Sequence, residues 1–135
     1  MALELVVVTP SGEALSQEIE QVVLPGEAGD FGVLESHERF LTPLQLGPMQ
    51  IISAKGTAWA AISSGFAEVD GSRVVVLVDA CTMADEIDHD ETESRRAEAE
   101  KTLATLAPGE EAAGERLRLS GIVARAELEL DVARR

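Results

Sequence analysis

The side chains that could take part in chemistry gather at two places in the chain. His37 stands beside Glu38, and an imidazole there could be imagined as a general base. His89 lies within the acidic stretch of residues 85–91, whose carboxylates suggest a metal site. These two places are the candidates for catalysis and for metal binding.

Neither place has the partners that such chemistry requires. His37 is accompanied by no candidate nucleophile or oxyanion motif. An EF-hand loop that began at Asp88 would need glycine and glutamate where the chain has Glu93 and Ala99. We therefore predict that the chain is not an enzyme and that it holds no metal and no cofactor.

A glycine-rich segment precedes His37, with the sequence PGEAGDFGVL over residues 25–34. Its glycines allow positive φ values and tight bends, and Pro25 is expected to end the preceding apolar run as a strand. The segment lacks the Gly-Lys-Ser/Thr ending of a phosphate-binding loop and lies between apparent strands. We predict a shaped surface loop that carries contacts.

Length and charge restrict the classes of partner. The chain has 135 residues and a formal net charge of −14, which suits one small domain with an appendage. This charge argues against nucleic acid and anionic lipid as ligands, so membrane association is expected only through other proteins. No apolar run approaches the ~20 residues of a membrane span, and no positive leader is present, so we expect a soluble, unprocessed protein. The single Cys81 is expected to be reduced and at least half-buried.

Short runs rich in β-branched residues fill the first part of the chain and predict strands. Asp70-Gly71 is a strong hairpin signal, and Lys55-Gly56 is a looser one. Residues 74–78 are apolar throughout, as expected of a strand covered on both faces. We predict an antiparallel β-sandwich or flattened barrel over residues 1–86. The predicted strands are residues 3–8, 19–24, 49–53, 57–63, 66–69 and 73–78.

The apolar period changes to that of helices over residues 87–135. Asp88 with Glu91 three residues later predicts a helix cap, and the first helix is expected to end at about Leu106. Pro108 and Gly109 separate it from a second helix with a broad apolar face, formed by Leu117, Leu119, Ile122, Val123, Ala124, Ala126, Leu128, Leu130 and Ala133. We predict an α+β, β-rich chain that ends in a two-helix antiparallel hairpin. Since the first helix is poor in apolar residues, the hairpin is expected to dock weakly and to be able to detach.

The end of the chain is locally basic in an otherwise acidic protein. From residue 116 onward, five arginines face three acidic residues. They could complement the dipole of the last helix, or they could form a basic helix that seeks an acidic partner. The arginines concerned are Arg116, Arg118, Arg125, Arg134 and Arg135.

The motifs together resemble the epsilon-subunit family of bacterial F-type ATP synthases. Residues 25–37 fit its P-G-x-x-G-x-[FL]-G-[VI]-[LY]-x-x-H segment, and residues 65–69 nearly fit its G-G-[FI]-x-E-V strand. The likeness extends in order and spacing to residues 6–10, 74–77 and the closing helix. It implies a β-sandwich with a C-terminal helical hairpin, and a non-catalytic central-stalk subunit that couples rotation of the c-ring to the catalytic head.

The resemblance also implies partners and contact residues. The partners would be the gamma subunit, the c-ring, and the beta subunits, with the alpha subunits as a further candidate. Asp30 and His37 would face the polar loops of the c-ring, unless Asp30 merely organises the turn and His37 packs locally. The family often has proline soon after this histidine, where the chain has Glu38-Arg39. The five arginines would meet the beta subunits and inhibit ATP hydrolysis.

Some members of the family bind ATP at the hairpin through an [IL]-D-x-x-R-A motif. Ile87 and Asp88 match it, but Glu91 and Thr92 occupy the arginine and alanine positions. An anion in place of a phosphate-binding cation repels the nucleotide, so ATP binding is disfavoured. Two further arginines, Arg95 and Arg96, could substitute only with a different geometry.

Two rival functions remain open at the level of sequence. One is a free-standing β-sandwich that binds a small ligand through its glycine-rich loop, and the other is a small enzyme that uses His37 and Glu38. A stalk subunit would bind gamma in gel filtration, whereas a ligand-binding module would not. The family likeness places the protein at the cytoplasmic face of the bacterial plasma (inner) membrane, as a peripheral protein.

Overall fold

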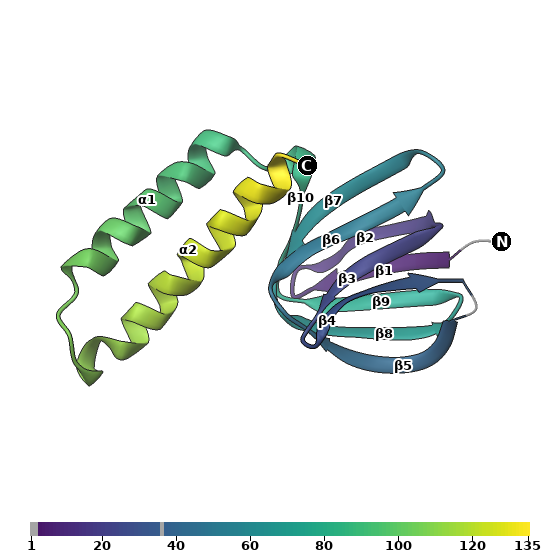
Figure 1. Cartoon of the computed structure of the whole chain (residues 1–135), viewed down its shortest axis with the longest axis horizontal. Coiled ribbons are helices and arrows are strands. Elements are labelled where there is room, and N and C mark those ends of the chain that lie inside the picture. The colour runs from purple at the N-terminus through teal and green to yellow at the C-terminus, as the bar shows by residue number, and fades with distance from the viewer. Residues whose placement is uncertain (1–2, 36) are drawn as a thin grey trace.

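A computed structural model describes residues 3–35 and 37–135, apart from the side chains of His37 and Glu38. Ten strands are followed by two long helices, and Figure 1 shows the strands on one side of the molecule and the helical hairpin on the other. The strands are β1 (Leu3–Thr9), β2 (Gly12–Ile19), β3 (Gln21–Gly26), β4 (Gly29–Leu34), β5 (His37–Leu44), β6 (Gly47–Ser53), β7 (Gly56–Ile62), β8 (Gly65–Gly71), β9 (Arg73–Val78) and β10 (Cys81–Met83).

The strands form one hydrogen-bonded path that folds over into two layers. Their order is β10-β7-β6-β3-β5-β8-β9-β1-β2, with β4 paired to β3 beside this path. The predicted β-sandwich is confirmed, and so are both predicted hairpins, β6–β7 and β8–β9. One neighbouring pair, β1 with β9, is parallel, so the antiparallel prediction is wrong there. Hairpin signals report pairs that are adjacent in sequence, and these two strands are not adjacent.

The core lies between the two layers and is made of alternating aliphatic side chains. Strand β9 shows the alternation clearly, because Val74 and Val76 are fully buried whereas Leu77 is 46% exposed. The prediction that this strand is covered on both faces is therefore wrong. Its second face lies open because the hairpin packs elsewhere, on β7 and β6. The largest fully buried side chains are Leu3, Leu5, Leu24, Met49, Ile51 and Ile62.

The glycine-rich segment is a β-hairpin, so the prediction of a surface loop is wrong. Strands β3 and β4 pair along their whole length, from Gln21 with Leu34 to Gly26 with Gly29. Pro25 does not end β3, because β6 pairs with β3 only over residues 21–23 and needs no N–H from the proline. Of the three described glycines in this segment, Gly29 alone has a positive φ, of 131°.

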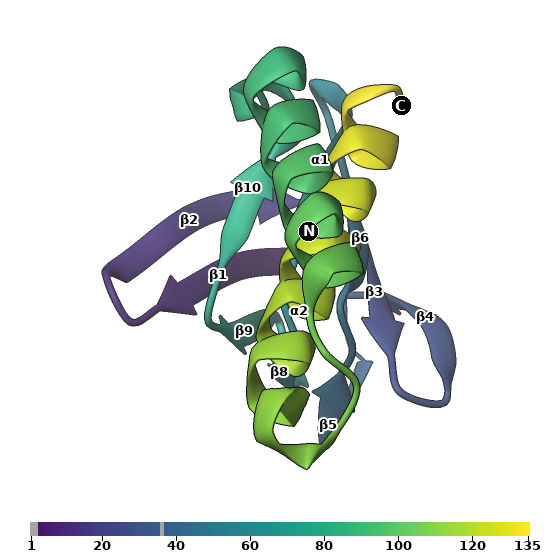
Figure 2. The ribbon, with the colours of Figure 1, turned by 90° about the vertical axis from the view of Figure 1, so that its left-hand side faces the viewer.

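The helical hairpin consists of α1 (His89–Thr105) and α2 (Ala113–Ala133), with short 3-10 helices at Ala84–Glu86 and Glu110–Ala112. The predicted cap is confirmed, because the Asp88 carboxylate accepts a hydrogen bond of 3.1 Å from the Glu91 N–H. Figure 2 shows the two helices side by side. The boundary at residue 86 between two domains stays a prediction.

Helix α2 has the two packing surfaces that its broad apolar face predicts. It packs against α1 on one side and against β7 and β6 on the other. Leu119, Ala126 and Leu130 of the predicted stripe are buried, whereas Leu117 is 77% exposed. The carboxylate of Glu129 is also buried, which the apolar pattern did not predict.

Candidate functional site

The first candidate surface is the tip of the β3–β4 hairpin, which projects from the sandwich (Figure 2). Asp30 lies next to the tip, is exposed, and pairs with Pro25 across the hairpin. Phe31 packs edge-on against Phe40 of β5, with ring centroids 5.8 Å apart, and so seats the hairpin on its neighbour. The tip therefore offers a carboxylate on a backbone that is stiffened by strand pairing.

His37 does not lie beside Asp30, although both stand in one sequence motif. It begins β5, where its backbone pairs with Gly71 at the β8–β9 turn, whereas the other end of β5 reaches Gly26 near the tip. Extended strands rise ~3.3 Å per residue, so the length of β4 separates the two positions. Its side chain lies outside the described part of the structure. The two predicted contact residues thus mark opposite ends of the sandwich.

The second candidate surface is an open apolar face of the sandwich, which we call the outer face. It consists of Leu41 and Pro43 of β5, Phe66 of β8, and Val75 and Leu77 of β9. Strand register places these residues on one side of the sheet, with Phe66 directly opposite Pro43 and Leu77. Phe66 is 51% and Leu41 64% exposed. The exposed side chain of Glu68 lies between Leu41 and Val75 in the same register, so the face is apolar around Phe66 and carries one carboxylate beside it. Exposed apolar surface of this kind is typical of contacts between proteins.

The third candidate surface is the groove between the two helices, a hollow of about 450 Å³ that includes Glu91, Arg95 and Arg118 in its lining. Arg95 donates hydrogen bonds through Nη2 to Glu129 at 2.7 Å and to Thr92 at 3.3 Å. Its guanidinium is thus committed to the neighbouring helix. Ile87 and Asp88, the matching part of the nucleotide motif, lie before α1, where Asp88 caps the helix.

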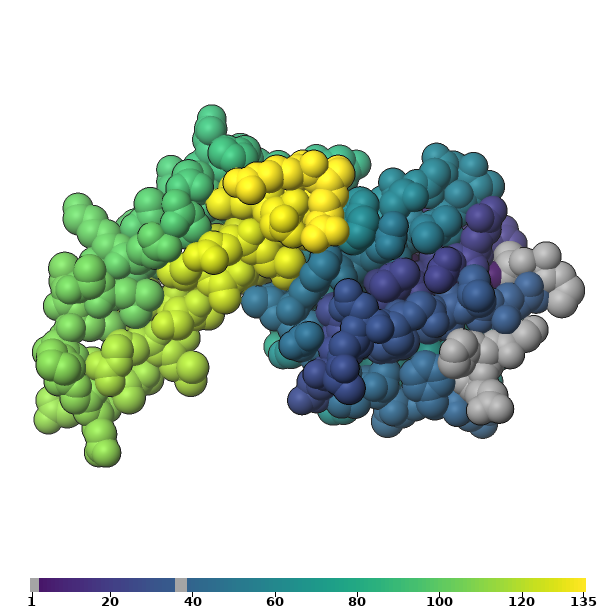
Figure 3. Space-filling view, in the orientation of Figure 1, coloured from purple at the N-terminus to yellow at the C-terminus, as the bar shows by residue number. Residues whose placement is uncertain are grey.

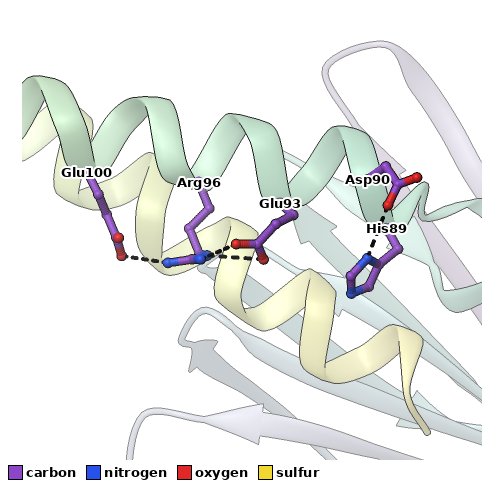
Figure 4. A network of polar contacts seen from close by, with 5 residues as sticks. All are labelled: His89, Asp90, Glu93, Arg96 and Glu100. Atoms are coloured by element: carbon purple, nitrogen blue, oxygen red, sulfur yellow. Dashed lines mark hydrogen bonds and ion pairs between the residues drawn. The ribbon is translucent and has the colours of Figure 1, made fainter.

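Arg96, the second arginine near that motif, is held on its own helix. It donates hydrogen bonds to Glu93 and, at 2.9 Å, to Glu100 (Figure 4). The bond from Arg96 to Glu93 lowers the pKa of the Glu93 carboxyl. The same figure shows His89 beside Asp90, with 3.7 Å between Nδ1 and Oδ1. Both candidate nucleotide-binding arginines, Arg95 and Arg96, are thus paired with carboxylates of the hairpin.

The five C-terminal arginines are distributed along α2 and the two residues that follow it. Arg116 donates hydrogen bonds to the carbonyls of Ala107 (3.0 Å) and Gly109 (2.6 Å), and so closes the loop between the helices. Arg118 pairs with Glu115 on the same helix. Arg125 lies half-buried midway along the helix. Arg116 and Arg118, near the start of the helix, thus fix local structure.

The other end of α2 lies against the sandwich. Arg135 bonds to Asp131 at 3.0 Å, and its guanidinium carbon lies 4.4 Å from the ring centroid of Trp59 on β7. Such cation–π contacts are attractive because the ring face carries negative charge. Figure 3 shows the C-terminal residues resting on the strands of this edge. Arg134 is exposed beside them.

The described residues also bear on metal, membrane and thiol chemistry. Among them, no three His, Cys, Asp or Glu side chains gather as a metal site, and no helix is long and apolar enough to cross a bilayer. Cys81 is half-buried, as expected. Burial, with a smaller contribution from the charge of Glu86, raises the pKa of the Cys81 thiol to about 11. This thiol is therefore a poor nucleophile at neutral pH.

Comparison with known proteins gives one consistent family. Residues 2–84 match the model of the ATP synthase delta/epsilon chain, β-sandwich domain. The ATP synthase epsilon chain of Helicobacter pylori is 35% identical over 125 residues, which cover 93% of this chain and 96% of that protein. The ATP synthase epsilon chain of Geotalea uraniireducens is 36% identical over 106 residues, which cover 78% of this chain and 77% of that protein.

Solved structures share the fold. A chain of the Euglena gracilis mitochondrial ATP synthase has a TM-score of 0.67 at 20% identity, covering 98% of this chain and 78% of that one. A chain from the central stalk and c-ring structure of the Tetrahymena thermophila mitochondrial ATP synthase has a TM-score of 0.64 at 13% identity. The match covers 98% of this chain and 97% of that one. The resemblance predicted from the sequence is thus confirmed, and the chain belongs to the delta/epsilon family of ATP synthase subunits.

Proposed function

We propose that this chain is a non-catalytic central-stalk subunit of an F-type, proton-translocating ATP synthase. The observation that carries the proposal is its similarity to bacterial epsilon chains, which includes the helical hairpin as well as the sandwich. In this role the protein transmits rotation of the c-ring to the catalytic head through binding alone. The same similarity favours a subunit over the free-standing ligand-binding module considered above.

The sandwich offers separate surfaces for two partners. We assign the outer face to the gamma subunit, because its apolar side chains are exposed in the isolated chain and burial would stabilise a complex. The hairpin tip with Asp30 is assigned to the polar loops of the c-ring, where a carboxylate can accept charge-assisted hydrogen bonds. His37, at the far end of the sandwich, would then contact the c-ring only if the ring spans both ends. These contacts would hold the subunit peripherally at the cytoplasmic face of the plasma membrane.

The gamma assignment is tested by gel filtration and titration calorimetry with the cognate gamma subunit. Phe66→Glu places a charge in the outer face, and we expect affinity to fall at least about tenfold, equivalent to about 1.4 kcal/mol. Leu34→Glu is the matched control, because Leu34 is 55% exposed on β4, outside that face. Equal affinities for Phe66→Glu and the unaltered chain would refute the assignment.

The c-ring assignment is tested with Asp30→Ala in binding to purified c-ring. Loss of one charge-assisted hydrogen bond is expected to weaken binding by about tenfold or more. Glu13→Ala removes another exposed carboxylate, from β2, and should leave binding unchanged. A similar loss in both variants would mean that net charge, and not the tip, is recognised.

The hairpin is assigned the regulatory part of the function. We propose that α2, released from the sandwich, presents its arginines to acidic segments of the beta subunits, with alpha as a further contact, and slows ATP hydrolysis. Arg134 and Arg135 support this, because Arg134 is exposed and Arg135 leaves Trp59 when the helix moves. Replacing both by alanine is expected to reduce inhibition of the catalytic head at low salt, and undiminished inhibition would refute their role. ATP binding to the hairpin stays disfavoured, because Glu91 lines the groove between the helices. The two candidate arginines, Arg95 and Arg96, are already paired with carboxylates of the hairpin.

A further inference from the structure

The interface between α1 and α2 contains one buried carboxylate, Glu129, which is 3% exposed. Its neighbours along the same helix, Ala126 and Leu130, are apolar and buried. The Oε1 atom of Glu129 accepts a hydrogen bond of 2.7 Å from Nη2 of Arg95, across the interface. A single arginine therefore compensates a charge that the hairpin has removed from water.

The compensation is incomplete. Within the described part of the chain, the buried Nε atom of Arg95 has no hydrogen-bond partner. Its ion-pair contact with Oε1 of Glu91 is 3.6 Å long, too far for a good hydrogen bond. A polar network of this kind stabilises its closed state less than well-packed apolar residues would. Opening the hairpin returns Glu129 to water and completes the hydration of Arg95, whose side chain is already 34% exposed, so the pair favours opening relative to an apolar pair.

The contacts between α2 and the sandwich are concentrated at the C-terminal end of the helix. Val132 is fully buried there, and Arg135 lies over Trp59. Figure 1 shows this end of the helix next to β7, whereas its first turns extend away from the strands. The helix can therefore be released by loss of a small contact, provided that it also separates from α1.

We propose that Arg95 and Glu129 form a latch whose incomplete pairing keeps the hairpin able to open. The pair fixes the alignment of α1 and α2 while they are packed, because Arg95 reaches Glu129 across the interface in that alignment. When the hairpin opens, water hydrates both charges. This hydration makes the open state more favourable than it would be with apolar side chains at the two positions. The consequence for inhibition rests on the proposed function of the hairpin, but the latch itself concerns the isolated chain.

Hydrogen exchange of the full chain tests the latch, because amide exchange detects opening even when the open state is rare. The double variant Arg95→Met/Glu129→Leu replaces the pair by apolar side chains, and exchange within α2 is expected to slow at least tenfold. Arg95→Met alone leaves Glu129 buried without its partner, and exchange is expected to accelerate at least tenfold. Amides of β6 provide the reference for global unfolding.

A matched control removes an exposed ion pair of the same residue types. Arg73 and Glu4 join β9 and β1 at 2.7 Å on the sandwich surface, so Arg73→Met/Glu4→Leu should leave exchange in α2 within twofold of the unaltered chain. The latch is overturned if the Arg95→Met/Glu129→Leu variant exchanges as fast as the unaltered chain or faster, or if the control slows α2 equally. Should Arg95→Met fail to fold, the double variant still decides.

A second readout separates the latch from the proposed function. Both latch variants are added to the cognate catalytic head, and ATP hydrolysis is measured. Slower exchange together with weaker inhibition supports both ideas. Slower exchange with unchanged inhibition supports the latch and contradicts the regulatory role of the hairpin. Unchanged exchange overturns the latch whatever happens to hydrolysis.

Discussion

The sandwich and the hairpin bury different kinds of side chain. The sandwich core is aliphatic, with side chains such as Leu5, Leu24 and Met49 fully buried. Among the described residues, the buried polar side chains are Thr92 and Glu129, and both belong to the hairpin. An aliphatic core has one favourable arrangement and no hydrated alternative, whereas a buried ion pair can return to water. The sandwich is therefore suited to fixed contacts, and the hairpin to changing position.

The largest expected effect tests the tightness of the sandwich. An alanine Cβ at Gly65 would lie 2.0 Å from the Leu77 carbonyl oxygen and 2.9 Å from a Val78 methyl carbon. Strand β9 cannot move away without disturbing the core, so Gly65→Ala is expected to lower the free energy of unfolding by about 3 kcal/mol. Urea unfolding followed by circular dichroism measures it. If Gly65→Ala lowered the free energy of unfolding by less than about 1 kcal/mol, strand β9 would be able to shift and accommodate the added methyl group.

A smaller effect is expected from the cap of the hairpin. Asp88→Ala removes the acceptor of the Glu91 N–H, and α1 should lose about 1 kcal/mol of stability. Faster amide exchange in the first turn of α1 is the measurement, with β6 unaffected. Asp88→Asn keeps a side-chain acceptor and is the control. If the two variants exchange alike, the carboxylate is not the cap that we describe.

The same glycine-to-alanine change should have the opposite sign in the hairpin. Gly121 is exposed within α2, and an added Cβ would meet nothing within 4 Å. Alanine loses less backbone entropy than glycine on forming a helix, so Gly121→Ala should stabilise α2 by about 0.8 kcal/mol. Thermal melting of helical circular dichroism measures the gain. Destabilisation would mean that another contact occupies this face.

The smallest expected effect concerns Cys81, at the edge of the sandwich before the hairpin. Its pKa, raised by burial to about 11 from 9.0, leaves about a hundredfold less thiolate at neutral pH than an exposed cysteine would have. Alkylation by iodoacetamide should therefore be slow near pH 8 and accelerate toward pH 11.

The pKa of Cys81 also has a consequence for stability. The unfolded chain ionises this thiol first, so its contribution to the stability of the fold is complete below about pH 9 and is lost as the pH rises through about 11. Near neutral pH, where the thiol is protonated in both states, the stability of the fold is expected not to vary with the ionisation of Cys81. Fast alkylation at pH 8 would contradict the burial of the Cys81 thiol and its raised pKa.

The parts of the fold that were predictable depend on local chemistry. Asp70-Gly71 forms its hairpin because Gly71 adopts φ of 59°, and Asp88 caps α1 through a bond three residues away. Strands β2, β4, β5 and β10 were not predicted, because their sequences are polar, glycine-rich, interrupted by Pro43, or very short. Their pairing comes from partners distant in sequence.

The candidate site was predictable only in part for the same reason. The arginines were noticed by their local charge and Asp30 through the family resemblance, but the separation of Asp30 from the start of β5 follows from β4 being a strand. Burial of Glu129 could not be predicted, since a charged residue in a helix is normally assigned to its solvated face. Its partner Arg95 lies on another helix, and no periodicity relates the two.

The most direct test of the division between a fixed sandwich and a movable regulatory hairpin is ATP hydrolysis by the cognate catalytic head. The head is reconstituted with the full chain or with residues 1–87, and gamma binding is measured in parallel. We predict that both bind gamma and that only the full chain lowers the rate of hydrolysis. Equal inhibition by residues 1–87, or their failure to bind gamma, would contradict this account.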